Sequence, residues 1–212
     1  MSDRPIPFSA EMVRAILDGR KTQTRRKMKV QPYPDSIVTV EHFNQTVIDR
    51  HGDMQPGPEI FGALWGNGEY GLRCPYGAPG DLLWVREAWR APSQYDDWPP
   101  SRIPPSVEAQ YIADARAPWI SRYRHARFMP RWASRITLEV ESVRVERLQD
   151  ITQKDAIAEG APESHSDIDR ISRRLGYQDF SRSWFAQKWG DIPGAWEANP
   201  WVWVIEFEKV KP

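Results

Sequence analysis

The sequence of 212 residues contains one cysteine, Cys74, so no disulfide bond can form within the chain. This usage is typical of a reducing compartment, and we expect a cytoplasmic protein in which Cys74 is a buried apolar residue rather than a nucleophile. No apolar run approaches the length of a membrane-spanning helix, and residues 1–8 lack the charged-then-apolar pattern of a signal peptide. We therefore expect no membrane partner.

Motifs for several kinds of active site are also missing. The histidines are scattered and no His or Cys pair has the spacing of metal ligands, so the sequence predicts neither a metal nor another cofactor. Neither a Gly-x-Ser-x-Gly elbow nor a Gly-rich phosphate loop is present. Their absence argues against the common serine hydrolases and P-loop enzymes.

Net charge is absent as well, because 29 basic residues balance 29 acidic ones. The whole chain therefore has no electrostatic preference for nucleic acid, and any such preference must come from a local patch. Two segments, 19–34 and 115–138, contain no acidic residue. The second interleaves arginines with aromatic residues, which suits single-stranded RNA or a nucleotide. A solvated basic surface with its rings turned inward explains the pattern equally well.

What is abundant is tryptophan, with 11 residues, and proline, with 19, which favours irregular connections over a helical bundle. We expect a helix over 10–18 between a Ser9 cap and Gly19, and another from the Thr152 cap to Gly160. A third helix over 178–189 carries Phe180, Trp184 and Phe185 at helical spacing, which predicts core packing rather than a ligand site.

Alternating and β-branched runs predict the strands. Together with the short helices they favour an α+β fold built around a small barrel. Segment 30–79 reads as a hairpin-like insertion, and 90–106, with five prolines, as an irregular loop. The expected strands are 82–89, 107–112, 136–148 with a bend near 141–142, and 201–207.

The most informative motif places Lys21 three residues before Thr24 within a basic run. A lysine acts as a base only when its pKa falls, and the neighbouring arginines favour that fall. In a strand the two side chains would point to opposite faces, so joint chemistry requires a turn between them. Glu159 ends a predicted helix, where the dipole raises a carboxyl pKa and suits proton transfer. An exposed basic turn and an exposed helix-end glutamate are the simpler interpretations.

The pattern Gly19-x-Lys21-x-x-Thr24-x-Arg26, with Gly80-Asp81 later opening a strand, resembles the ASCH superfamily, whose usual signature is Gly-x-Lys-x-x-Glu-x-Arg. Threonine in place of glutamate is similar to the small bacterial ASCH proteins that hydrolyse 4-N-acetylcytidine. The resemblance implies a PUA-like β-barrel. It also implies a catalytic set of Lys21, Thr24 and Glu159, the last placed because residues 151–156 look like the family's Leu-Thr-Glu-Lys-His-Ala.

The resemblance covers both ends of one domain and leaves 30–79, 90–135 and 161–196 as insertions. Residues 84–89 and 129–133 resemble longer ASCH proteins encoded by phages and prophages. The implied activity is removal of an acyl group from 4-N-acylcytidine or from acylated cytosine. The implied partner is a modified nucleoside or single-stranded RNA. A non-catalytic RNA-binding or modified-base-sensing module and a single-strand ribonuclease are the alternatives. The expected substrate-binding residues are Arg26, Trp84, Arg86 and Glu87.

Overall fold

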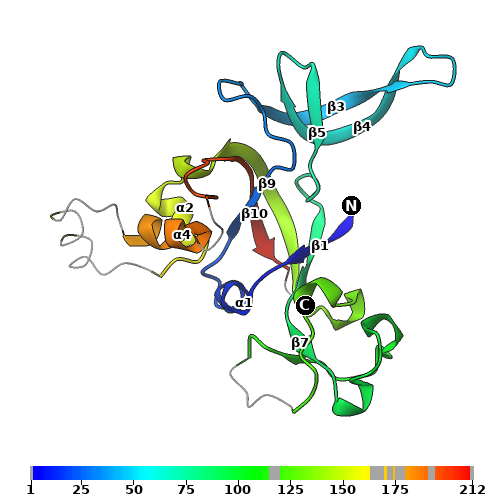
Figure 1. Cartoon of the computed structure of the whole chain (residues 1–212), viewed down its shortest axis with the longest axis vertical. Coiled ribbons are helices and arrows are strands. Elements are labelled where there is room, and N and C mark those ends of the chain that lie inside the picture. Colours follow the sequence, from blue (N-terminus) through cyan, green and yellow to red (C-terminus); the bar gives the residue numbers. More distant parts are fainter. Residues whose placement is uncertain are drawn as a thin grey trace.

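The computed structural model describes residues 2–114, 120–162, 170, 174, 180–190 and 194–210. Its described part is a mixed α+β fold, as expected, with a five-stranded sheet at the centre, a three-stranded sheet at one end and short helices beside the central sheet (Figure 1).

The central sheet runs in the order β1-β6-β9-β10-β2. Strand β1 is parallel to β6, and the other neighbours are antiparallel. Strands β1 and β2 are the two edges, so the described residues form an open sheet instead of the expected closed barrel. The Arg26 side chain connects the edges by donating from Nη2 to the Pro7 carbonyl at 2.6 Å. The strands are β1 (Asp3–Pro7), β2 (Gln23–Lys27), β6 (Leu82–Arg86), β9 (Thr137–Arg147) and β10 (Trp201–Lys209).

Side-chain alternation along β10 divides the core into two parts, because successive residues of a strand point to opposite faces. Trp203 and Ile205 belong to one core, which also contains residues of helix α1 (Ala10–Leu17). Val202 and Val204 belong to a second core beneath helices α2 (Gln153–Ala158) and α4 (Phe180–Gly190). The sheet is therefore covered by helices on both faces.

Local capping explains where the helices begin and end. The Ser9 side chain accepts a hydrogen bond from the Met12 amide, as expected for an N-cap. Thr152 and Asp155 form the predicted capping box at α2. The third expected helix is confirmed over α4, while residues 178–179 lie outside the described part. None of the helices in the described residues is long and apolar enough to cross a membrane.

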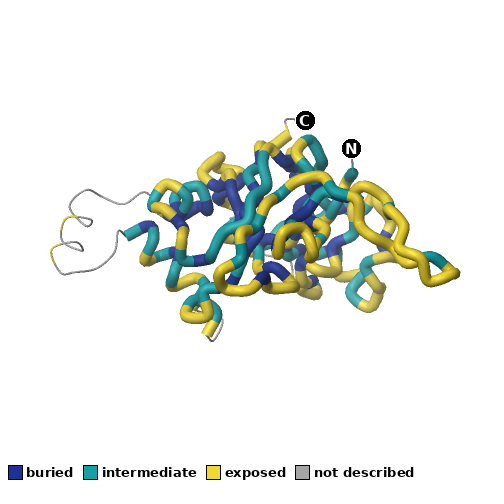
Figure 2. The backbone as a smooth tube through the Cα atoms, turned by 90° about the horizontal axis from the view of Figure 1, so that it is seen from above, coloured by how far each residue is buried: buried dark blue, intermediate teal, exposed yellow. Residues whose placement is uncertain are grey.

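The insertion over 30–79 forms the expected hairpins. Its inner end contributes Ala63 and Trp65 to the first core, and the outer half of the β3–β4 hairpin projects from the molecule with mostly exposed residues (Figures 1 and 2). Cys74 is 1 % exposed in the same core, and burial raises its thiol pKa to about 11, which confirms a packed apolar residue. The strands are β3 (Thr39–Ile48), β4 (Met54–Trp65) and β5 (Tyr70–Arg73).

The insertion over 90–135 is irregular, as its prolines predict, and packs around Trp89, Ile103 and Met129. The strand expected over 82–89 breaks after Arg86, and the one expected over 107–112 is only two residues long. This region holds β7 (Trp89–Arg90), β8 (Gln110–Tyr111) and the 3-10 turns η1 (Ser93–Tyr95), η2 (Pro100–Arg102), η3 (Ala126–Phe128) and η4 (Arg131–Ala133); η5 (Leu148–Asp150) follows β9.

Long-range pairing creates two strands that the sequence did not predict, β1 and β2. Strand β1 tolerates Pro5 and Pro7 because it lies at an edge, where a missing N–H costs little. The bend expected in β9 is confirmed: Ser142 pairs with Glu206 and Val140 with Phe207, so Glu141 is skipped in the register.

Asp81 fastens the start of the chain to the turn before β6, and its removal should weaken the fold. Its carboxylate accepts from the Ser2 amide at 2.6 Å and the Ala78 amide at 3.2 Å. Desolvation raises the Asp81 pKa, but these hydrogen bonds outweigh it and the net pKa lies below the usual value. We expect Asp81→Ala to lower the free energy of unfolding by about 1–3 kcal/mol at neutral pH, measured by urea denaturation.

A depressed carboxyl pKa contributes stability above the unfolded-state value of about 4 and loses it as pH falls through the folded value. The difference between wild type and Asp81→Ala should therefore shrink on acidification. A difference that stays constant through this range would contradict the assigned hydrogen bonds.

Candidate functional site

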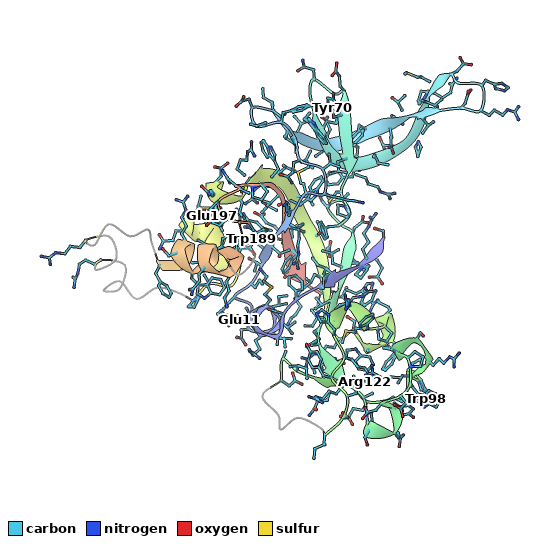
Figure 3. All side chains as sticks on the ribbon, viewed as in Figure 1. Glu11, Tyr70, Trp98, Arg122, Trp189 and Glu197 are labelled. Atoms are coloured by element: carbon cyan, nitrogen blue, oxygen red, sulfur yellow. The ribbon has the colours of Figure 1, made fainter. Side chains whose placement is uncertain are left out.

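A cavity of about 390 Å³ lies between α1, β2, the end of α2 and α4. Glu11 on α1 and Trp189 on α4 both line it and lie near each other in Figure 3. Three residues that the sequence predicted for the site, Thr24, Arg26 and Glu159, also line it. The remaining lining residues are Ser9, Met12, Ala15, Arg25, Lys27, Gly160, Trp184, Phe185, Lys188 and Ala195.

Lys21 does not line this cavity, and its side chain is fully buried. Its ammonium group donates to the Gln23 carbonyl at 2.6 Å, and to the carbonyl and Oε2 of Glu159, each at 2.8 Å. Three hydrogen bonds use all the donors of an ammonium group, and none of these goes to Thr24. Burial lowers the Lys21 pKa, although the adjacent Glu159 carboxylate raises it in part. The lysine is thus not the exposed basic residue of the simpler interpretation.

Glu159 is the C-cap of α2 and is 5 % exposed. Besides the bond from Lys21 to Oε2, its Oε1 accepts from Arg25 Nη1 at 3.4 Å. Its backbone also forms a bridge with that of Lys21. The glutamate is therefore a buried anion between two cations, not an exposed helix end.

Thr24 and Arg26 lie two residues apart on β2, which places them on the same face of the strand. Thr24 is 1 % exposed and its backbone pairs with that of Ile205. The Arg26 guanidinium lies 5.0 Å from the centre of the Phe8 ring, and Lys21 Nζ lies 5.8 Å from the same ring. Nε of Arg26 is buried without a hydrogen-bond partner in the described residues. Arg26 lines the cavity, but this Nε atom is itself buried.

Arg25 is a residue that the sequence did not single out. Its side chain is fully buried and pairs with Glu146 at 2.8 Å, Asp155 at 3.5 Å and Glu159 at 3.4 Å. Arg144 extends this network through ion pairs to Glu146 and Asp155. A basic run is usually solvated, so nothing local indicated that Arg25 would enter the interior. The acidic partners come from other elements, which sequence spacing does not reveal.

Aromatic side chains of α4 form one wall of the cavity. Phe185 is 4 % exposed and packs in the second core, as the helical spacing predicted. Trp184 packs against the same core, and both residues also line the cavity. Lys188 donates to Glu11 at 2.7 Å and joins α4 to α1 across the cavity. The recurrence of aromatic residues at Trp184, Phe185 and Trp189 was the available signal.

Trp84, Arg86 and Glu87 do not line this cavity. The Arg86 guanidinium lies over the Trp84 ring, with its Cζ atom 4.6 Å from the ring centre. Glu87 is 1 % exposed and accepts two hydrogen bonds from Arg135, at 2.9 and 3.1 Å. Burial raises the Glu87 pKa although Arg135 lowers it in part. Of the expected substrate-binding residues, the structure therefore brings only Arg26 to the cavity.

In the ranges that the structure describes, no three His, Cys, Asp or Glu side chains gather as metal ligands would. Comparisons of the chain with models of protein families, with curated proteins and with solved structures found no match. The chemistry of the cavity follows from its own groups, which include the Thr24 hydroxyl, the Arg26 guanidinium and the Glu159 carboxylate paired with the buried Lys21 amine.

Gly160 allows the close approach of this pair, and an alanine there should disturb it. Its φ is +97°, and an added Cβ would lie 3.1 Å from Ala15 Cβ and 3.3 Å from Lys21 Cβ. We expect Gly160→Ala to lower the free energy of unfolding by about 1–3 kcal/mol in urea denaturation. The control Gly190→Ala meets no atom within 4 Å at the end of α4 and should be neutral or stabilising. Equal effects of both changes would contradict this role.

The buried ion pair should show strong energetic coupling. Glu159→Gln leaves the Lys21 ammonium without its main counter-charge, and we expect a loss of about 3–5 kcal/mol in the free energy of unfolding. Adding Lys21→Met to Glu159→Gln removes that unpaired charge. The double variant should therefore lose less free energy of unfolding than the two single variants lose together. Urea denaturation of all four proteins measures the coupling. Additive losses would show that the pair is not a unit.

Proposed function

We propose that this protein is an amidohydrolase that removes an acyl group from the exocyclic nitrogen of 4-N-acylcytidine or acylated cytosine. The observation that carries the proposal is that Thr24, Arg26 and Glu159 line one cavity while Glu159 is hydrogen-bonded to the buried Lys21. The resemblance of residues 19–26 to the ASCH motif supports it. On the same ground we assign the curved central sheet, with edges joined by Arg26, to the PUA-like class.

The cavity has a suitable size and lining for a nucleoside. Its volume of about 390 Å³ lies within the usual range of small-molecule sites. Trp184, Phe185 and Trp189 offer flat rings on which a pyrimidine can stack. Polar residues line the cavity along β2 and at the end of α2, and Glu11 on α1 and Lys188 on α4 also line it. We place the base against the rings with its acyl substituent toward Thr24.

In the proposed reaction the Thr24 hydroxyl attacks the acyl carbonyl carbon. A threonine hydroxyl is a weak acid, so its proton must leave as the new C–O bond forms. Lys21 becomes able to take that proton after it passes one of its own to Glu159 along their 2.8 Å hydrogen bond and turns the freed lone pair toward Thr24, to which none of its present hydrogen bonds goes. The transfer leaves a neutral amine and a neutral carboxylic acid, and the lowered Lys21 pKa favours it.

The remaining protons then balance. Glu159, now a carboxylic acid, donates its proton to the departing cytosine nitrogen as the C–N bond breaks, which leaves an acyl ester on Thr24 and restores the original ion pair. A second transfer within the pair allows Lys21 to deprotonate the water that attacks the ester, and Glu159 gives its proton to the Thr24 oxygen as the acyl C–O bond breaks, which releases the carboxylic acid and restores Thr24 and the ion pair. In this scheme the Arg26 guanidinium donates to the developing oxyanion, and Arg25 holds Glu159 in place.

The test is conversion of 4-N-acetylcytidine to cytidine by purified protein without added metal, followed by chromatography. We expect Glu159→Gln and Lys21→Met to lower kcat/KM by ~10²–10⁴-fold, and Thr24→Ala by at least as much. Thr24→Ser should keep measurable turnover because it retains a hydroxyl. Thr22→Ala is the matched control, since Thr22 is an exposed threonine at an unspecified position within the motif.

The pH dependence adds a second readout. Because the proposed cycle needs the proton that Lys21 and Glu159 share, kcat/KM should fall when Lys21 loses that proton at high pH, and because burial lowers the Lys21 pKa this fall should lie below the ordinary lysine value of about 10.4. The absence of cytidine with wild-type protein, or equal yields from wild type and Thr24→Ala, would overturn the proposal.

A further inference from the structure

Three aromatic side chains of the 90–135 insertion are exposed together at the end of the molecule opposite the three-stranded sheet. Trp98 is 45 % exposed, Tyr123 is 52 % exposed and Phe128 is 53 % exposed. They line one hollow of about 480 Å³, which we call the aromatic surface. Figure 3 shows Trp98 and Arg122 close together at this end and Tyr70 at the other. The other lining residues are Asp97, Pro99, Pro100, Arg122, Arg124 and His125.

The backbone beneath the aromatic surface is held in place. The Trp98 ring packs edge-on against Tyr95 at 5.5 Å, and the Trp98 amide donates to the Tyr95 carbonyl at 3.0 Å. Arg124 is buried and also donates to the Tyr95 carbonyl, at 2.5 Å. The Arg122 amide donates to Asp96 at 2.8 Å. These contacts preorganise the exposed rings, so little conformational freedom is lost when a ligand stacks on them.

Cationic groups accompany the rings. The Arg127 guanidinium is exposed and lies 4.7 Å from the centre of the Phe128 ring. Arg122 is exposed beside Tyr123. Arg122, Arg127 and the buried Arg124 thus give three arginines around the hollow, against the two carboxylates of Asp96 and Asp97.

The aromatic residues of the acid-free segment 115–138 divide between the interior and the surface. Trp132 turns inward against Trp89, at 5.8 Å between ring centres, whereas Tyr123 and Phe128 remain outside. Arg116 and Trp119 lie outside the described residues. The rings of this segment therefore point inward at Trp132 and outward at Tyr123 and Phe128.

We propose that the aromatic surface binds single-stranded nucleic acid, with bases stacked on Trp98, Tyr123 and Phe128 and phosphates held by Arg122 and Arg127. Flat rings beside guanidinium groups provide the two interactions that an unpaired strand requires, and stacking tolerates any base. A duplex hides its base faces, so it cannot use exposed rings in this way. The proposal does not depend on the hydrolase, because no residue of the aromatic surface lines the other cavity.

Fluorescence anisotropy of the full chain with end-labelled oligonucleotides tests this binding. The probes are oligouridylate and oligothymidylate of about 12 nucleotides, within the ~4–16 nucleotides that such sites cover, and a duplex of the same length. The RNA and DNA probes distinguish the two natural sources of an unpaired strand. Thermal unfolding of each variant verifies that the fold is retained.

We expect wild type to bind the single strands more tightly than the duplex. Trp98→Ala and Phe128→Ala should each weaken binding by about fivefold or more, and Trp98→Tyr should restore most of the loss because it retains a stacking ring. Arg127→Ala should reduce the slope of log K against log salt by about 0.7, as for one lost phosphate contact.

Two control variants match these changes away from the aromatic surface. Tyr33 is 63 % exposed beside Tyr70, and Arg50 lies at the exposed tip of the β3–β4 hairpin. Tyr33→Ala and Arg50→Ala should leave both affinity and salt slope unchanged. Absence of binding at low salt, equal affinity for the duplex, or equal losses in the controls would overturn the proposal. So would self-association that Trp98→Ala abolishes without any oligonucleotide binding, because the surface would then contact a second copy.

Discussion

A buried lysine ammonium group requires oxygen partners on every side, and meeting that requirement organises the central part of this protein. Lys21 obtains all three acceptors from Gln23 and Glu159, which ties the entry to β2 to the end of α2. Gly160, beside this pair, has a φ of +97° at which a side chain is strained, and an added Cβ would lie 3.3 Å from Lys21 Cβ. An uncompensated charge in the interior is very unfavourable. The position of Lys21, at the entry to β2, therefore depends on the position of Glu159 at the end of α2.

Successive residues of β2 beside the Lys21–Glu159 pair point in two directions. Arg25 forms ion pairs with Glu159, Glu146 and Asp155, and Arg144 pairs with Asp155 in turn. This network fixes the position of the Glu159 carboxylate. Thr24 and Arg26, the alternate residues of β2, line the cavity. One short edge strand thereby supplies both a buried charge network and part of the cavity lining.

The two acid-free segments show that composition does not decide what a basic run does. Residues 19–34 bury Lys21 and Arg25 against carboxylates contributed by α2 and β9. Residues 115–138 instead leave Arg122 and Arg127 exposed beside aromatic rings, while Arg135 is paired with Glu87. Local sequence is similarly basic in both cases. The difference lies in which distant carboxylates the fold brings within reach.

Features that depend on neighbouring residues were predictable from the sequence. Caps at Ser9 and Thr152 set the helix starts, and alternation marked the strands over 137–147 and 201–209 and the hairpin insertion. The motif pointed to Lys21, Thr24 and Glu159, which the structure brings to one region. Only the tertiary structure decided that the sheet is open, that Trp84, Arg86 and Glu87 lie away from the cavity, and that Arg25 and the aromatic wall of α4 belong to it. Capping and alternation act over a few residues, whereas pairing of β1 with β6 or of Arg25 with Glu146 joins positions far apart in the chain, whose proximity no local pattern encodes.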